Sequence, residues 1–231
     1  MHLRMNILFD LDGTLTDPKI GITKSVQYAL ERFGIHVDDL DLLEPFIGPP
    51  LLEGFSTLYQ FEEEQCKQAI SYYREYFSEQ GIYENTVYPG IIELLQQLKK
   101  EDHQLFVATS KPTVFAEIII KHFEMSSYFD FVGGSNLDGT RSSKGDVIRY
   151  VMDQHGLKQE QSVMIGDRKH DIIGAHQNQI PSIAVEYGYG SREELLGSQP
   201  TVICGTVKEL GDCLKDEAAV LHQSWTRNGA I

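Results

Sequence analysis

The sequence has few cysteines, few positive charges and no long apolar segment. Its three cysteines, Cys66, Cys204 and Cys213, lack metal-ligand or redox spacing, which is typical of thiols in a reducing compartment. No apolar run approaches the roughly 18 residues of a transmembrane helix. The first residues also lack the apolar stretch of a signal peptide. We therefore expect a cytoplasmic protein with no membrane partner.

Positive charge is scarce: the chain has 20 Lys and Arg residues and 34 Asp and Glu residues, which gives a formal net charge of −14. Nucleic acids and anionic membranes bind basic surfaces, so neither is an expected partner. A small anionic substrate is still compatible, because a metal ion and a few lysines can reverse the field locally. With 41% hydrophobic residues, the 231-residue chain can bury a core, either as a monomer or as a homodimer.

The first apolar run, residues 5–9, predicts a short buried strand that ends at Asp10, Asp12 and Gly13. Two carboxylates this close repel unless a cation or a proton lies between them. Mg²⁺ is a hard cation that takes such oxygen ligands. The plain alternative is an Asp-Gly turn with two solvated acids, because both residue types are common in turns.

Two different patterns follow the first strand. Apolar residues from 18 to about 82 follow helical spacing, which predicts an all-helical insertion. Within this insertion, segment 45–51 contains proline and glycine, which predicts a turn followed by the start of a helix. Beyond Tyr88, apolar runs alternate with helical patterns, which indicates a parallel sheet with helices on both faces. The expected further strands are 104–108, 129–132, 162–165, 182–185 and 201–204. We expect an α/β protein: a Rossmann-like core of residues 1–17 and 83–231, and a helical domain of residues 18–82.

Polar residues follow three of these predicted strands. Thr109 and Ser110 come after the second strand, where a hydroxyl and N–H groups can hold a phosphoryl oxygen or simply cap a helix. Lys144 opens the helix after the third strand, where a solvated charge is the plain reading. Asp167 follows the fourth strand, and Asp171 can return to it from the next helix, whose dipole it would also favour.

These motifs resemble, in order, those of the haloacid dehalogenase-like phosphohydrolases. They are D-L-D-G-T-L-T-D at 10–17, Thr109, Lys144 and G-D-x-x-x-D at 166–171. The resemblance implies a sheet order of 3-2-1-4-5 and makes the helical insertion a cap domain. Segments 46–51, 109–112, 139–141, 166–171 and 187–190 are similar to the branch that holds phosphoglycolate phosphatases and bacterial 5′-nucleotidases. Gln179 departs from the pattern, because relatives often have a turn glycine there.

The resemblance also implies roles for individual residues. Asp10 would be the nucleophile, and Asp12 the general acid and then the general base. Mg²⁺ would be held by Asp10, Asp167 and the backbone carbonyl of Asp12, with Asp171 in its outer shell. The phosphate group or substrate would be bound by Thr109, Ser110, Lys144 and Gly48, with Arg141 as a competitor for the role of Lys144.

The expected function is a Mg²⁺-dependent phosphomonoesterase acting through an aspartyl-phosphate on a small phosphorylated metabolite, of the phosphoglycolate or nucleoside 5′-monophosphate class. Family members without the second acid dehalogenate, so Asp12 favours phosphate chemistry, and Thr14 favours a phosphatase over a mutase. A sugar phosphomutase and a non-catalytic phosphate-binding regulatory scaffold are the alternatives. Glu186, near the end of the fifth strand, would tune the metal or point outward, and His170 is expected in an exposed loop.

Overall fold

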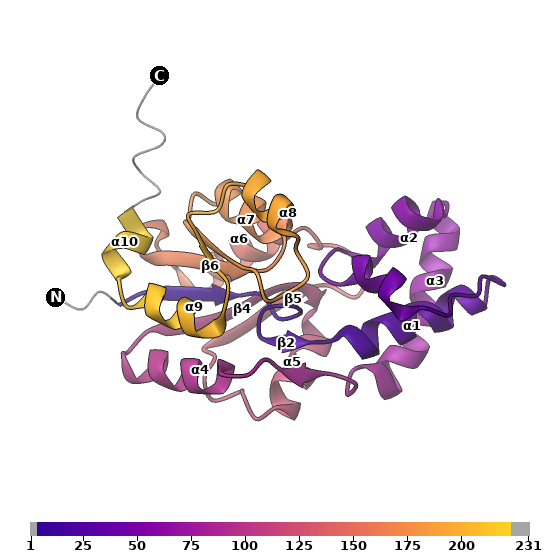
Figure 1. Ribbon diagram of the computed structural model, residues 1–231, viewed down its shortest axis with the longest axis horizontal. Coiled ribbons are helices and arrows are strands. Elements are labelled where there is room, and N and C mark those ends of the chain that lie inside the picture. Colours follow the sequence, from indigo (N-terminus) through magenta and orange to yellow (C-terminus); the bar gives the residue numbers. More distant parts are fainter. Residues whose placement is uncertain (1–3, 223–231) are drawn as a thin grey trace, which may run out of the picture.

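The computed structural model describes residues 4–222, so both ends of the predicted core lie outside the described residues. Its centre is a six-stranded sheet in the order β5-β4-β1-β6-β7-β8 (Figure 1). The strands are β1 (Asn6–Phe9), β4 (Gln104–Pro112), β5 (Phe131–Ser135), β6 (Ser162–Gly166), β7 (Ser182–Val185) and β8 (Val202–Cys204). Every neighbouring pair is parallel. The predicted α/β fold and the order 3-2-1-4-5 are confirmed, and β8 extends the sheet beyond the fifth strand.

Helices cover both faces of this sheet (Figure 1). They are α4 (Ile91–Lys100), α5 (Thr113–His122), α6 (Lys144–His155), α7 (Lys169–Gln177), α8 (Arg192–Gly197), α9 (Val207–Leu214) and α10 (Glu217–His222). In β1, Ile7 and Phe9 pack with α4, α5 and α9, whereas Leu8 packs with α6 and α7. Successive side chains of a strand point to opposite faces, so a strand covered on both faces needs the unbroken apolar run seen in the sequence.

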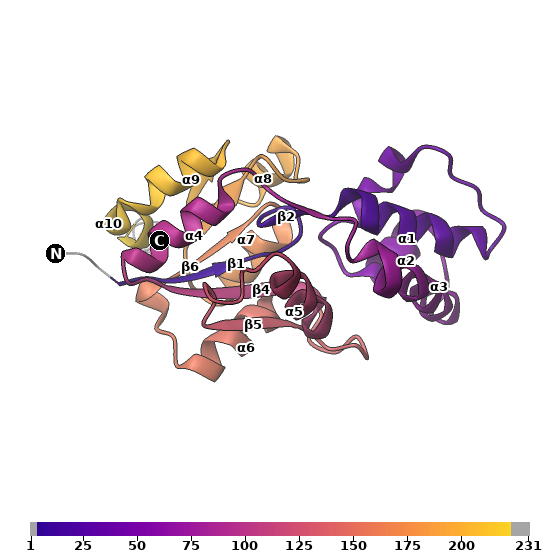
Figure 2. The same ribbon diagram turned by 90° about the horizontal axis from the view of Figure 1, so that it is seen from below.

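The segment between the first and second core strands is helical and lies beyond one end of the sheet (Figure 2). It contains α1 (Lys19–Glu31), a 3₁₀ helix (Leu40–Phe46), α2 (Leu51–Tyr59), α3 (Glu63–Tyr76) and a π-helical turn (Phe77–Gly81). Its apolar faces meet around Val26, Leu30, Phe55 and Ala69, all fully buried. The helical character matches the predicted spacing, whereas a separate domain at 18–82 stays a prediction.

A short antiparallel ribbon carries both connections between this helical segment and the sheet. It pairs β2 (Thr16–Asp17) with β3 (Thr86–Val87). Tyr189, from the loop after β7, donates a hydrogen bond to the Asp17 carboxylate in this ribbon. The end of the sheet and the ribbon are therefore tied together by a side chain as well as by the backbone.

The structure corrects the bounds of two strands. The strand predicted at 129–132 is β5, which begins at Phe131 and continues to Ser135. β4 does not end at residue 108: it continues through Thr109 and Ser110 to Pro112, with a register shift after Ala108 and a pairing of Pro112 with Ser135. The partner strand β5 extends this ladder, which no local pattern reveals. Among the described residues, no helix combines the length and apolarity needed to cross a membrane.

Candidate active site

Acidic side chains gather where β1 and β6 end. Asp10 and Asp12 follow β1, Asp167 follows β6, and Asp171 lies in the first turn of α7. The chain runs outward from β1 to β4 and β5 and then returns to β6, so β1 and β6 flank a topological switch point, where ligands bind in open α/β sheets. Carboxylate oxygens of Asp10, Asp167 and Asp171 lie within 4.8 Å of one another, and all three residues are buried.

Two glycines let these acids approach the backbone. Gly13 has a φ of 82°, and a Cβ there would lie 2.2 Å from Oδ2 of Asp167. A Cβ on Gly166 would lie 2.1 Å from Cγ of Asp171. Any larger residue would displace a carboxylate, so the Asp-Gly and Gly-Asp pairs of the sequence are needed for packing as well as for the turns.

Lys144 supplies positive charge to the acid cluster from the start of α6. Its Nζ lies 2.7 Å from Oδ1 of Asp10 and 2.8 Å from Oδ1 of Asp171, and it donates to the Ala108 carbonyl at 3.1 Å. Burial lowers the pKa of Lys144, but the two carboxylates outweigh this effect, so the pKa rises above its ordinary value. Lys144 is therefore protonated at neutral pH.

One ammonium does not balance three carboxylates. Burial, followed by the charges of Asp171 and Asp10, raises the pKa of Asp167 well above its ordinary value. Burial also raises the pKa of Asp171, to about 6, although Lys144 opposes the shift. Buried carboxylates that lie this close repel one another unless a cation or a proton lies between them, and their purely oxygen donor set fits a hard divalent ion such as Mg²⁺. The Asp171 carboxylate, expected in an outer shell, lies in the same cluster as the other two.

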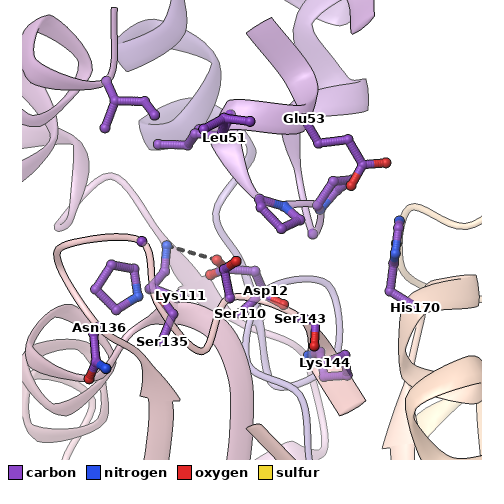
Figure 3. A pocket seen from close by; sticks show the side chains of 18 of the residues that line it. Asp12, Leu51, Glu53, Ser110, Lys111, Ser135, Asn136, Ser143, Lys144 and His170 are labelled. Atoms are coloured by element: carbon purple, nitrogen blue, oxygen red, sulfur yellow. Dashed lines mark ion pairs between the residues drawn. The ribbon is translucent and has the colours of Figure 1, made fainter. Parts of the chain in front are cut away.

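The carboxylate of Asp12 points towards Lys111 (Figure 3). Lys111 Nζ lies 2.7 Å from Oδ2 of Asp12 and 4.5 Å from the ring centroid of Phe77. The other Asp12 oxygen is buried without a hydrogen-bond partner among residues 4–222. Burial raises the pKa of Asp12, and Lys111 opposes this shift. Lys111 was not predicted as a site residue; its place after Thr109 and Ser110 was the only available signal.

The predicted phosphate- and substrate-binding residues take different positions. Thr109 is buried in β4, and its hydroxyl accepts a hydrogen bond from the Lys111 N–H at 3.2 Å. Ser110 and Gly48 line the cavity beside Asp12. Arg141 instead donates to the Gly134 carbonyl at 2.9 Å. Lys144 rather than Arg141 therefore accompanies the acids, while the individual roles stay predictions.

A cavity of about 700 Å³ separates these groups from the helical segment. Apolar and aromatic residues form much of its wall: Phe46, Leu51, Ile70, Tyr73 and Phe77 from the helical segment, and Phe115, Leu137 and Ile173 from the core. Polar groups, including Glu53, Arg74 and Asn136, interrupt this wall (Figure 3). Such a mixture suits a ligand with an apolar body and a few polar atoms.

His170 and Glu186 differ in whether they face the cavity. The expectation that His170 lies in an exposed loop is wrong: it lies in the first turn of α7, half-buried, and lines the cavity opposite Glu53 (Figure 3). Burial lowers the pKa of His170. Glu186 pairs with Arg192 and is not among the cavity-lining residues, so its carboxylate faces α8 rather than the acid cluster.

Comparisons with known proteins agree on one family. Residues 7–185 match haloacid dehalogenase-like hydrolases. A 5′-nucleotidase of Pseudomonas aeruginosa is 51% identical over 91% of this chain and 95% of its own length. The tyrosine-protein kinase PtkA of Mycobacterium tuberculosis is 36% identical over 90% of this chain and 72% of its own length. The crystal structure of a predicted phosphatase from Clostridium acetobutylicum superposes with a TM-score of 0.90, at 51% identity, over 92% of this chain and 98% of that one.

Proposed function

The chain belongs to the haloacid dehalogenase-like hydrolase family and is a phosphatase, and we propose that it hydrolyses nucleoside 5′-monophosphates in a Mg²⁺-dependent reaction through an aspartyl-phosphate. One observation carries this proposal. The Asp10 carboxylate lies beside the Lys144 ammonium, at the switch point, with Asp12 two residues further on. A nucleophile, a balancing charge and a second acid thus occupy one crevice.

The first half of the reaction transfers the phosphoryl group to Asp10. A carboxylate is a weak nucleophile, and Lys144 offsets its repulsion from the anionic substrate. A carboxylate oxygen of Asp10 forms a bond to phosphorus while the bond from phosphorus to the leaving oxygen breaks. Asp12 gives its proton to that oxygen, and the raised pKa of this buried carboxyl favours the protonated form.

The second half returns the enzyme to its starting state. Asp12, now ionised, takes a proton from a water molecule, whose oxygen attacks phosphorus and displaces the Asp10 carboxylate as inorganic phosphate forms. Asp10, Asp167 and Asp171 are the grouped carboxylates that would hold Mg²⁺. The family resemblance adds the Asp12 carbonyl as a further ligand. When bound, the ion supplies positive charge next to the phosphoryl oxygens.

The cavity supports a nucleoside as the leaving group. A two-carbon group such as glycolate would occupy a small part of about 700 Å³, whereas a base and a ribose can contact its aromatic wall. Phe46, Tyr73 and Phe77 supply rings, and Asn136 and Glu53 supply polar atoms. A relative of 51% identity is a 5′-nucleotidase, which agrees with this choice.

Phosphate release from a substrate panel tests the proposal. The panel contains nucleoside 5′-monophosphates, phosphoglycolate, sugar phosphates and pyrophosphate, each assayed with Mg²⁺ and with a chelator. We expect metal-dependent release, fastest from a nucleotide, and no turnover by a folded Asp10→Asn variant. A preference for phosphoglycolate would refute the substrate class, and near-normal activity of Asp10→Asn would refute the nucleophile.

Transfer of the phosphoryl group to another hydroxyl is the competing chemistry, because the kinase PtkA is also a relative. The same aspartyl-phosphate would form, but an alcohol rather than water would attack it. Loss of substrate without release of phosphate would identify this reaction, and a sugar phosphomutase would give the same signature. A folded, metal-binding protein that consumes no substrate would support a regulatory scaffold.

A further inference from the structure

The loop formed by residues 47–50 of the helical segment is hydrogen-bonded to Arg168 of the core. Nη1 of Arg168 donates a hydrogen bond to the Ile47 carbonyl at 2.6 Å. Nε of the same guanidinium donates to Oε1 of Glu194 at 2.9 Å, and Nη2 donates to Oε2 at 3.3 Å. One side chain therefore joins the helical segment to α8. It does so away from solvent, since the side chain of Arg168 is 13% exposed and that of Glu194 is 19% exposed.

The loop is shaped to accept this arginine. Gly48 has a φ of 100°, and a Cβ at that position would lie 2.9 Å from Cγ of Arg168. Pro49 and Pro50 follow directly and restrict the backbone, while Ile47 is fully buried. A positive φ and a close approach both favour glycine here, so the backbone conformation and the arginine contact agree.

The arginine also belongs to the turn that carries the acid cluster. It lies directly after Asp167, and its own backbone N–H donates to Oδ2 of Asp171 at 3.0 Å. Glu194 accepts a further hydrogen bond from the Lys169 N–H at 2.9 Å, which fixes the partner of the guanidinium. The contact to Ile47 is thus anchored on the same few residues as the candidate metal site.

We propose that Arg168 is a positioning residue that sets substrate specificity by holding the 47–50 loop in the wall of the cavity that Asp12 and Lys144 also line. The proposal rests on the proposed function. Gly48, Pro49 and Pro50 line the cavity, and Phe46 and Leu51 flank them in its wall. Holding the loop down therefore completes the wall that faces the leaving group. Arg168 does not line the cavity, so it acts through the loop and not by contact with substrate.

Two kinds of substrate should depend differently on the wall that the 47–50 loop completes. A nucleotide needs the completed wall, because its leaving group fills the cavity. Acetyl phosphate has a two-carbon leaving group that is stable as an anion, so it needs neither the wall nor a proton from Asp12. Arg168 should therefore affect nucleotides selectively, whereas damage to the acid cluster would affect both substrates.

The experiment compares Arg168→Gln with Arg192→Gln on both substrates in the presence of Mg²⁺. Arg192 is a matched control because it lies in α8, as Glu194 does, pairs with Glu186 and is 65% exposed on its side chain. For Arg168→Gln we expect kcat/KM for the nucleotide to fall at least about tenfold, the size expected for one charge-assisted hydrogen bond. Acetyl phosphate should change by less than about threefold on the same scale.

Two further variants keep the test decisive. Arg168→Lys retains the charge and one donor, so it should recover part of the nucleotide activity. Glu194→Gln weakens the carboxylate partner that holds the Arg168 guanidinium in place and should reproduce the selective loss even if Arg168→Gln folds poorly. Equal losses on the two substrates, or no loss on the nucleotide, would overturn the inference while leaving the proposed function intact. A wild-type protein that releases no phosphate would overturn both.

Discussion

Replacement of Lys144 by methionine should strongly destabilise the metal-free protein. The side chain is 2% exposed and forms ion pairs of 2.7 Å and 2.8 Å with Asp10 and Asp171. Methionine is also unbranched and keeps most of the volume, so the main change is the loss of the charge. Removing one partner of a buried ion pair costs about 3–5 kcal/mol, because the remaining charge is left uncompensated. We expect a loss of this size in the free energy of unfolding near neutral pH.

The loss should shrink as the pH falls. Burial already raises the pKa of Asp167, and that of Asp171 to about 6. The ammonium lowers the pKa of Asp171, so its removal raises that pKa further. As the pH falls through this range, Asp171 takes up a proton, and Asp167 also binds its proton more readily than an ordinary aspartate, so the ammonium has less negative charge to offset. The variant and the parent protein should therefore approach the same stability towards about pH 4.

Urea denaturation in the presence of a chelator, at neutral pH and at about pH 4, measures the loss of unfolding free energy in Lys144→Met. Lys215→Met is the matched control, because Lys215 pairs with Asp212 at 2.8 Å on the surface, where both side chains are more than half exposed. This control should leave the unfolding midpoint unchanged. Equal losses for the two variants, or a Lys144→Met deficit that does not depend on pH, would refute the electrostatic reasoning.

Three other predictions each concern a single residue. Lys111 lowers the pKa of Asp12, so Lys111→Gln should shift the pH–rate profile of kcat to higher pH; an unchanged profile would contradict this. Gln179 has a φ of 57°, which glycine adopts more easily, so Gln179→Gly should raise the free energy of unfolding by up to about 1 kcal/mol. Urea denaturation measures this change, and a less stable variant would contradict the prediction. The pKa of Asp171 is raised to about 6 in the folded protein, so its protonation stabilises the metal-free fold fully below about pH 4, and this contribution is lost as the pH rises through 6. The melting temperature measured with a chelator should therefore fall between pH 4 and pH 6, and a rise over this range would contradict the prediction.

The sheet could be predicted from the sequence because its strands are buried on both faces and therefore read as unbroken apolar runs. Ile7, Leu8 and Phe9 show this most clearly. The two-residue strands β2 and β3 and the six-residue helix α8 are too short to produce a periodic pattern. The extension of β4 to Pro112 depends on its pairing with Ser135 of β5, which local spacing does not encode.

The acids of the candidate site follow strand ends, so their proximity could be predicted once the strand order was known. The contacts of Lys111 and Arg168 could not. Arg168 meets Ile47 across 121 residues of sequence, and a lone arginine beside an aspartate has no local signature. Gln179 is a useful intermediate case. The family resemblance puts Gln179 where relatives often have a turn glycine, and its backbone does have a positive φ.

The ribbon of β2 and β3 has an evolutionary consequence. Because Asp17 pairs directly with Thr86, the helical segment enters and leaves the core as the tip of a hairpin does. In the topology of the sheet, this whole segment is a long turn, and no strand of the six-stranded sheet lies within it. We expect a graft that joins Asp17 to Thr86 by a tight turn to keep the phosphoryl-transfer chemistry of Asp10 and lose discrimination among leaving groups. Such a result would mean that chemistry and selectivity can diversify independently along one lineage.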